Sequence, residues 1–354
     1  MADAHKVVIA PAWLDLAEAI AAGPGAILIL GGADSGKSTL ARLLAVRCHE
    51  MGLRTVLVDC DLGQSVLGLP STISATAVVS SERLNAASPL FQFVGAVSPQ
   101  GHVDRVITSL GDVMGRVREL GPQAIVIDTT GFIDGAEARE LKHRKMDLLR
   151  PKHVAALQRG DELEHILTPR CGTHEPHVHR LAVCADVRKR SQQERRRLRE
   201  EKFGEYFREA KLLELDTGRI VFRGDWFRPG QRLPDRTLET LSGILEARVL
   251  YGEKDAKEVT LVAAGPGSEE CTSEICSLLN SERVRTVDAR SFADSLLGLG
   301  DERGRSLALS IVKELGPEDN NLLVYAPLVS CNQVRTAEFS FLKLRLSGEE
   351  ISQG

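Results

Sequence analysis

The 354-residue sequence lacks three features that would place it in a specialised class of proteins. It has no run of about 18 apolar residues, which excludes a transmembrane helix. The N-terminus, Met1–Lys6, has no basic start followed by a long apolar stretch, so we expect no secretory signal. The sequence also lacks an excess of positive charge. Its net charge is −4, so any attraction to phosphate must come from local patches.

The cysteine pattern also lacks the spacing of common metal and redox sites. The seven cysteines form no C-x-x-C pair and their number is odd, which favours a reduced, cytoplasmic protein with packed thiols. A tract with Cys171, His174, His177 and His179 looks like a metal site. Zinc sites, however, take ligand pairs from two separated segments, and no second pair is visible nearby. We therefore interpret the tract as a loop that runs into a strand.

Short apolar runs divide the first part of the chain. Their length is that of strands buried on both faces of a parallel sheet. They are 26–30, 55–59, 124–128 and 153–157, with helical stretches at 14–22, 37–50 and 104–119. Alternation of strand and helix predicts an α/β fold, a parallel sheet with helices on both faces.

The composition changes near residue 186 and again near 211. Residues 186–204 are rich in Arg, Lys, Glu and Gln. Beyond 211, short apolar runs such as 219–222, 258–262 and 321–325 alternate with glycine-containing turns. We predict a first domain over 1–210 and a smaller, β-rich α+β domain over 211–354.

A phosphate-binding motif follows the first apolar run. The segment GGADSGKS, Gly31–Ser38, matches G-x-x-x-x-G-K-[ST] between a strand and a helix, which is the context that makes the pattern specific. Its backbone N–H groups and the helix N-terminus attract phosphate, Lys37 can reach the β- and γ-phosphates, and Ser38 can ligate Mg²⁺. The predicted ATP-binding residues are Gly31, Gly32, Ala33, Asp34, Ser35, Gly36, Lys37, Ser38 and Thr39.

The next strand ends in the acidic segment Asp59-Cys60-Asp61. Because the carboxyl ends of parallel strands form the ligand crevice, both aspartates are expected near the phosphates. A carboxylate there can hold Mg²⁺ through water or accept a proton from an attacking hydroxyl. We assign this role to Asp61; the alternative is a carboxylate of a strand-end turn.

Seven basic residues lie within twelve positions, from Arg188 to Arg199. Helical spacing brings Arg188, Arg195 and Arg199 to one side. Because glutamates follow, this segment could be a solvated, salt-bridged helix. In a chain that also holds a phosphate loop, we favour a movable arginine segment that closes over the transferred phosphoryl group, and we call residues 186–204 the lid.

These motifs together resemble the polynucleotide 5′-hydroxyl kinases. The resemblance rests on the order of five elements: GGADSGKST, DCDLGQ, VGAVSP at 94–99, DTTGF at 128–132, and the arginine cluster that ends in Tyr206-Phe207. The family includes the RNA kinase subunit of the pre-mRNA cleavage factor, ribosomal-spacer-processing kinases and short archaeal members, which this chain resembles most.

The resemblance implies catalytic residues and a cofactor. Lys37 matches the phosphate-binding lysine, Ser38 the Mg²⁺ ligand and Asp61 the acid that activates the 5′-hydroxyl. With Tyr206-Phe207 as the anchor, Arg190, Arg195 and Arg199 match the lid arginines, whereas helical projection favours Arg188 over Arg190. The implied cofactors are ATP and Mg²⁺.

The resemblance also implies substrate contacts. Gln64, Thr129, Thr130 and Phe132 are expected to bind the end of the acceptor strand. Phe132 stands where the family has Trp; it still offers a stacking face, although a smaller one. The implied reaction is transfer of the ATP γ-phosphoryl group to the 5′-hydroxyl end of RNA or DNA.

Two other functions remain open from the sequence. A P-loop protein could bind ATP and a partner without kinase activity, although Lys37, Asp61 and the arginine cluster are intact. A nucleoside-type kinase would need a closed pocket, whereas the 129–132 element and a separate C-terminal domain favour an open groove.

Overall fold

The computed structural model describes residues 10–80, 90–168, 176–184, 187–227, 230–265, 271–316, 321–327 and 329–351. The chain forms two compact units, Met1–Arg199 and Glu200–Gly354. Helix α6, Gln192–Phe207, contains the point at which the first unit ends and the second begins.

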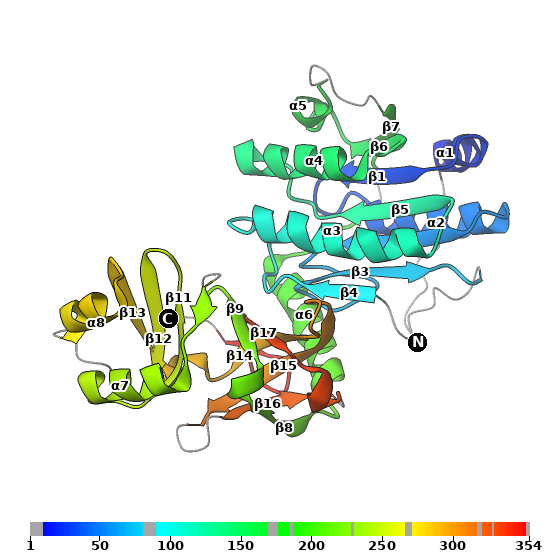
Figure 1. The fold of residues 1–354 in the computed structure, drawn as a ribbon. Coiled ribbons are helices and arrows are strands. Elements are labelled where there is room, and N and C mark those ends of the chain that lie inside the picture. Colours follow the sequence, from blue (N-terminus) through cyan, green and yellow to red (C-terminus); the bar gives the residue numbers. More distant parts are fainter. Residues whose placement is uncertain are drawn as a thin grey trace. The chain divides into compact units, whose positions relative to one another are not determined.

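The first unit is built on a mixed sheet, which has seven strands in the described residues, in the order β4-β3-β2-β5-β1-β6-β7 (Figure 1). Strands β2, β5, β1, β6 and β7 run parallel, whereas β3 and β4 form an antiparallel edge. The strands are β1 Ala26–Gly31, β2 Thr55–Cys60, β3 Thr72–Ala77, β4 Leu90–Phe93, β5 Ala124–Thr129, β6 His153–Gln158 and β7 His177–Ala182. The four predicted strands are confirmed.

Helices cover both faces of this sheet, as predicted. They are α1 Pro11–Ala22, α2 Lys37–Glu50, α3 Val103–Glu119, α4 Gly135–Leu149 and α5 Glu164–Leu167. In β1, Ile27 and Ile29 pack with α1 and α2, while Leu28 and Leu30 pack with α3, α4 and α5. Because alternate side chains of β1 enter two apolar layers, the strand reads as a continuous apolar run. Figure 1 shows α3 and α4 side by side over one face.

The second unit is β-rich, as predicted. Its strands are β8 Lys211–Asp216, β9 Val221–Gly224, β10 Gln231–Arg232, β11 Val249–Lys254, β12 Glu258–Ala263, β13 Arg283–Asp288, β14 Ser295–Gly300, β15 Ser306–Leu315, β16 Asn321–Ala326, β17 Thr336–Leu344 and β18 Glu350–Ile351. Strands β10-β11-β12-β13 form one sheet. The other sheet has the order β18-β17-β14-β15-β16-β8, and β9 pairs with β17. Helices α7, Asp235–Leu245, and α8, Thr272–Leu279, also belong to this unit.

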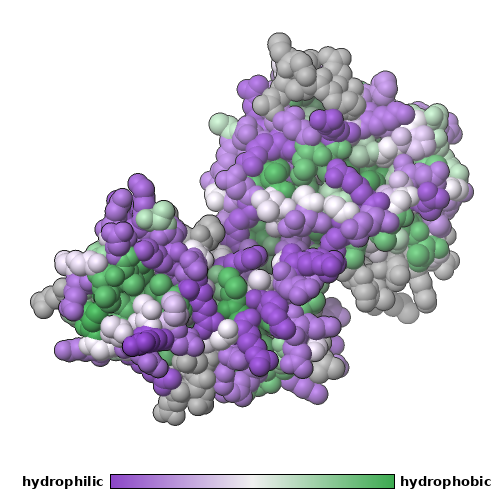
Figure 2. Space-filling view, in the orientation of Figure 1, coloured by the Kyte–Doolittle hydropathy of each residue, from purple (hydrophilic) through white to green (hydrophobic). Residues whose placement is uncertain are grey.

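An aromatic cluster forms the centre of the second unit. Phe222 stacks on Tyr251 with ring centroids 4.3 Å apart, and Phe227, Phe292 and Phe339 pack around them. Hydrophilic residues dominate the visible face of each unit, with a larger apolar area on the side of the second unit that carries α7 and α8 (Figure 2). In the described part of the chain, no helix is long and apolar enough to cross a membrane.

Candidate active site

The phosphate loop lies between β1 and α2, where the sequence predicts it. Gly31 ends β1, and Gly36 precedes the first helical residue, Lys37, in a left-handed conformation with φ of 91°. A side chain at position 36 would be strained there, which explains the glycine. The loop therefore presents the N-terminus of a 14-residue helix to a ligand, an arrangement that favours phosphate.

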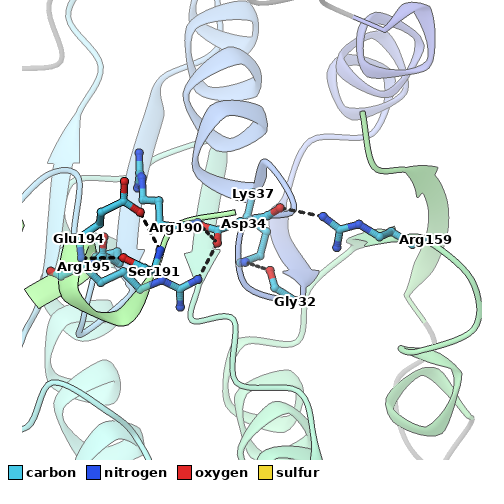
Figure 3. Close-up of polar contacts among 9 residues, drawn as sticks. Gly32, Asp34, Lys37, Arg159, Arg190, Ser191, Glu194 and Arg195 are labelled. Carbon is cyan, nitrogen blue, oxygen red and sulfur yellow. Dashed lines mark hydrogen bonds and ion pairs between the residues drawn. The ribbon is translucent and has the colours of Figure 1, made fainter. Parts of the chain in front are cut away.

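Lys37 is folded back on its own loop. Its side chain is buried, and Nζ donates a 2.6 Å hydrogen bond to the Gly32 carbonyl (Figure 3). Burial lowers the pKa of Lys37, and the nearby carboxylates of Asp128 and Asp61 act in the opposite direction. A phosphate oxygen can replace the Gly32 carbonyl as the partner of this ammonium.

Two aspartates after β2 have different environments. The Asp59 carboxylate accepts hydrogen bonds from the backbone N–H groups of 61, 66 and 67 and from the Ser65 hydroxyl, so it holds the loop that follows. Asp61 is half-buried, and its Oδ1 accepts from the backbone N–H groups of Gly63 and Gln64 at 3.1 and 3.0 Å. These bonds fix the Asp61 side chain while Oδ2 can take a proton from an acceptor hydroxyl.

Asp128 is a candidate site residue that is absent from the sequence-based set. It lies at the carboxyl end of β5, in register with Asp59 of β2. Its side chain is buried, the Ser38 hydroxyl hydrogen-bonds to it, and its Oδ1 has no partner in the described residues. A cavity of about 10 Å³, the size of one water, is lined by Ser38, Asp59 and Asp128. The sequence carries a signal for Asp128, which ends the apolar run 124–128 as Asp59 ends the run 55–59.

The donor set fits a magnesium ion that keeps several waters. Among the described residues, no group of three or more His, Cys, Asp or Glu side chains is arranged to hold a metal ion. Mg²⁺ at phosphates, however, needs only one or two protein ligands besides water and phosphate oxygens. The Ser38 hydroxyl and the unpartnered Oδ1 of Asp128 lie together at the phosphate loop, with Asp61 nearby, and can supply these contacts.

The titration of Asp128 leads to a testable pH dependence. Burial, and then the neighbouring Asp59, raise the pKa of Asp128 from 3.8 to about 7. Because the folded-state pKa is the higher one, the stability linked to its proton is complete below the unfolded pKa and is lost as pH rises through about 7. Between about pH 5 and pH 8, we expect the melting temperature of the nucleotide-free wild type to fall more than that of the nucleotide-free Asp128→Asn variant. Parallel melting profiles would contradict this assignment.

The 129–132 element packs directly on the phosphate loop. A Cβ at Gly131 would lie 2.6 Å from the backbone N and Cα of Ala33, so only glycine fits. Thr129 is buried and its hydroxyl donates to the Ile29 carbonyl at 2.7 Å, while the Thr130 hydroxyl accepts from the Phe132 N–H at 2.9 Å. The Phe132 side chain is half-buried.

A buried lysine that the sequence analysis missed supports this element. Lys142 of α4 is fully buried, and Nζ donates to Thr129 Oγ1 at 3.1 Å and to the Thr130 carbonyl at 2.6 Å. Burial, followed by the nearby Lys145 and Lys37, lowers the pKa of Lys142 well below its ordinary value. A lysine in a charged helical segment is normally solvated, so the sequence carries no signal for this contact.

The arginine segment begins with a capping box. Ser191 Oγ accepts from the backbone N–H of Glu194, and the Glu194 carboxylate accepts from that of Ser191. The sequence spacing S-x-x-E predicts such a box. Arg195, one residue further, donates from Nη2 to Asp34 Oδ2 at 2.6 Å, and its backbone carbonyl accepts from Gln64 Nε2 at 3.1 Å.

The other predicted lid arginines differ in how they are placed. Arg190 contacts the phosphate loop through its backbone N–H, which donates to Asp34 Oδ2 at 2.9 Å. Arg199 lies four residues beyond Arg195 on α6. Arg188, which helical projection favoured, is exposed and pairs with Glu194. Arg159, which no motif indicated, donates to the Asp34 carbonyl at 3.0 Å (Figure 3).

The described part of the histidine tract lies on the edge strand β7. Cys171 and His174 fall outside the described residues, whereas His177 and His179 belong to β7, so the predicted strand is confirmed. His153 of β6 donates from Nε2 to the Gly23 carbonyl, and its Nδ1 lies 3.1 Å from His179 Nε2. The His179 ring therefore supplies the proton of this contact.

Comparison with known proteins identifies the family. The sequence model described as the P-loop of the mRNA cleavage and polyadenylation factor CLP1 matches residues 31–209. The chain belongs to the CLP1 P-loop family. The match includes the phosphate loop, Asp61, Asp128, the 129–132 element and the lid.

Curated relatives extend this similarity beyond the P-loop region. The polyribonucleotide 5′-hydroxyl-kinase of Pyrococcus furiosus is 28% identical over 333 residues, which cover 93% of this chain and 90% of the relative. The kinase of the same description from Methanocaldococcus jannaschii is also 28% identical, with coverage of 93% and 89%. The polyribonucleotide 5′-hydroxyl-kinase Clp1 of Danio rerio is 29% identical over 51% of this chain and 43% of its own length.

A solved structure supports the fold. Clp1p in a Clp1p–Pcf11p complex superposes with a TM-score of 0.58 at 14% identity, covering 94% of this chain and 78% of that chain. At this identity the likeness establishes the CLP1 fold for this chain.

Proposed function

We propose that this chain transfers the γ-phosphoryl group of ATP to the 5′-hydroxyl end of RNA. The observation that carries the proposal is that Asp61 lies near Lys37 of the phosphate loop and Arg195 contacts Asp34 of the same loop, in a chain that aligns over 93% of its length with a polyribonucleotide 5′-hydroxyl-kinase. DNA is the alternative acceptor.

The family match ends at residue 209, which supports 1–210 as the kinase region. The cysteine pattern supports a cytoplasmic location.

Each group of candidate site residues has its own role in the proposed reaction. The loop Gly31–Ser38 binds the phosphates, and Lys37 exchanges the Gly32 carbonyl for a phosphate oxygen. Asp61 orients the 5′-hydroxyl and takes its proton, while Lys37 and the lid arginines offset the charge of the transition state. Ser38, Asp128 and Asp61 would hold Mg²⁺, which neutralises phosphate charge when bound.

Product analysis separates the kinase from a P-loop ATP-binding protein without transferase activity. The wild-type protein is incubated with γ-labelled ATP, Mg²⁺ and a 5′-hydroxyl RNA oligonucleotide. We expect the label on RNA rather than in inorganic phosphate. Label released only as inorganic phosphate would show an ATPase and overturn the proposal.

The lid makes a separate prediction at Arg199. If Arg199 contacts the phosphoryl group during transfer, Arg199→Ala should lower kcat by about 10²-fold. Thermal stability should change less than kcat does, since Arg199 is only half-buried and ion pairs near the surface contribute about 0–1 kcal/mol. Arg199→Lys should restore little activity, because an ammonium lacks the planar fork that binds two phosphate oxygens.

The matched control is Arg197→Ala, which removes an exposed arginine of the same helix. Steady-state kinetics and melting curves of the three variants decide between the two interpretations of α6. A solvated, salt-bridged helix predicts wild-type kcat in both Arg199 variants, together with a slight change in melting temperature.

A further inference from the structure

An acidic residue inside the phosphate loop requires an explanation. Asp34 lies between Gly31 and Lys37, where the loop would surround a triphosphate, and its side chain is only 13% exposed. A carboxylate at this position repels phosphate unless a cation neutralises it. The described contacts of Asp34 supply this compensation.

Two other segments, the lid and the residues after β6, contact Asp34 of the phosphate loop (Figure 3). Its Oδ2 accepts from Arg195 Nη2 at 2.6 Å and from the backbone N–H of Arg190 at 2.9 Å, both in the lid. Its backbone carbonyl accepts from Arg159 Nη2 at 3.0 Å, after β6. Asp34 therefore joins the phosphate loop to the start of the lid and neutralises its own charge with Arg195.

The orientation of Arg195 leaves a donor unused. Arg195 Nε is buried and has no hydrogen-bond partner in the described residues, although Nη2 is held by Asp34. A buried N–H without a partner is costly, and phosphate oxygens are strong acceptors for a guanidinium. Ser35 Oγ, in the same loop, is also buried and unpartnered. The site thus has two unused polar groups beside the loop that would bind the nucleotide.

We propose that Asp34 is a positioning residue for transfer. It holds one side of the Arg195 guanidinium so that the remaining donors face the phosphoryl group, and it cancels the charge that it brings into the loop. This inference rests on the proposed kinase function. The role proposed for Asp34 differs from that of the other loop residues. Asp34 affects transfer through Arg195, and it has little effect on ATP binding.

Asp34→Asn tests this role with minimal disturbance. Asp34 has a positive φ of 50°, a conformation that Asn tolerates better than Ala does. The Asn carbonyl can still accept from the Arg190 N–H, but the charge that holds Arg195 is gone. We expect kcat for a 5′-hydroxyl RNA to fall about 10-fold or more. The Kd of ATP, measured by calorimetry without acceptor, should tighten or stay within about twofold of wild type.

A double-mutant cycle identifies the path of the effect. If Asp34 acts through Arg195, then Asp34→Asn added to Arg195→Ala should lower kcat no further. Arg180→Ala is the matched control, since Arg180 is exposed, lies outside the lid and pairs with Glu164 instead of Asp34. We expect this control to keep wild-type kcat and ATP affinity.

The outcomes separate this proposal from the kinase proposal. A wild-type protein that transfers no label to RNA contradicts the kinase function itself. An active wild type with an equally active Asp34→Asn variant overturns the positioning role. Loss of ATP affinity together with a lower melting temperature in Asp34→Asn would also overturn it, because Asp34 would then only maintain the loop conformation.

Discussion

Asp61→Asn is expected to reduce phosphoryl transfer by about 10²-fold or more while ATP still binds. The substitution keeps the shape of the side chain, and the amide oxygen can still accept from the Gly63 and Gln64 N–H groups, so the loop after β2 should keep its conformation. The amide cannot take a proton from the 5′-hydroxyl, and it is a weaker partner for hydrated Mg²⁺.

The informative measurement pairs ATP affinity with the transfer rate at saturating ATP on one preparation. Asp104→Asn is the matched control, since it removes an exposed carboxylate from α3. If ATP affinity collapses in Asp61→Asn while the saturated rate equals that of wild type, Asp61 is a nucleotide-binding residue and its catalytic role is wrong.

Lys37→Ala should lower turnover by a factor on the order of 10² or more, because it removes the side-chain cation at the β- and γ-phosphates. Lys37→Met should behave in the same way and keeps more of the buried volume. Burial lowers the pKa of Lys37, so the folded state holds this proton less tightly than the unfolded chain does. At neutral pH the buried ammonium therefore opposes folding.

This linkage gives the lysine variants a second signature. We expect Lys37→Met to melt at or above the wild-type temperature while its transfer rate falls. Turnover close to that of wild type in a folded Lys37 variant would reject the assignment of this lysine to the phosphates. Thermal melting and steady-state kinetics on the same samples provide both results.

The central sheet was predictable because its strands are apolar on both faces. Strands β1, β2, β5 and β6 appear in the sequence as uninterrupted apolar runs. Strand β3, with the sequence TISATA, was not predicted, because small polar residues fill its buried positions. The sequence of helix α4 does not show which face is buried, because the helix buries Lys142 and Lys145, and lysines are normally solvated.

The candidate site was predictable only where its residues adjoin a motif. The phosphate loop and Asp61 follow strands directly, so their position could be inferred from local pattern. The contact between Asp34 and Arg195 joins residues 161 positions apart, and no spacing in the sequence indicates it. Asp128 also has a local signal in the sequence, because it lies at the acidic end of the apolar run 124–128.

The position of the transferred label tests the central claim most directly. The wild-type protein is supplied with γ-labelled ATP and, in parallel, a 5′-hydroxyl RNA oligonucleotide, the same RNA with a 5′-phosphate, and a free nucleoside. We predict label on the 5′-terminal nucleotide of the 5′-hydroxyl RNA alone. Label on the free nucleoside with none on RNA, or no label on any acceptor, would contradict the account.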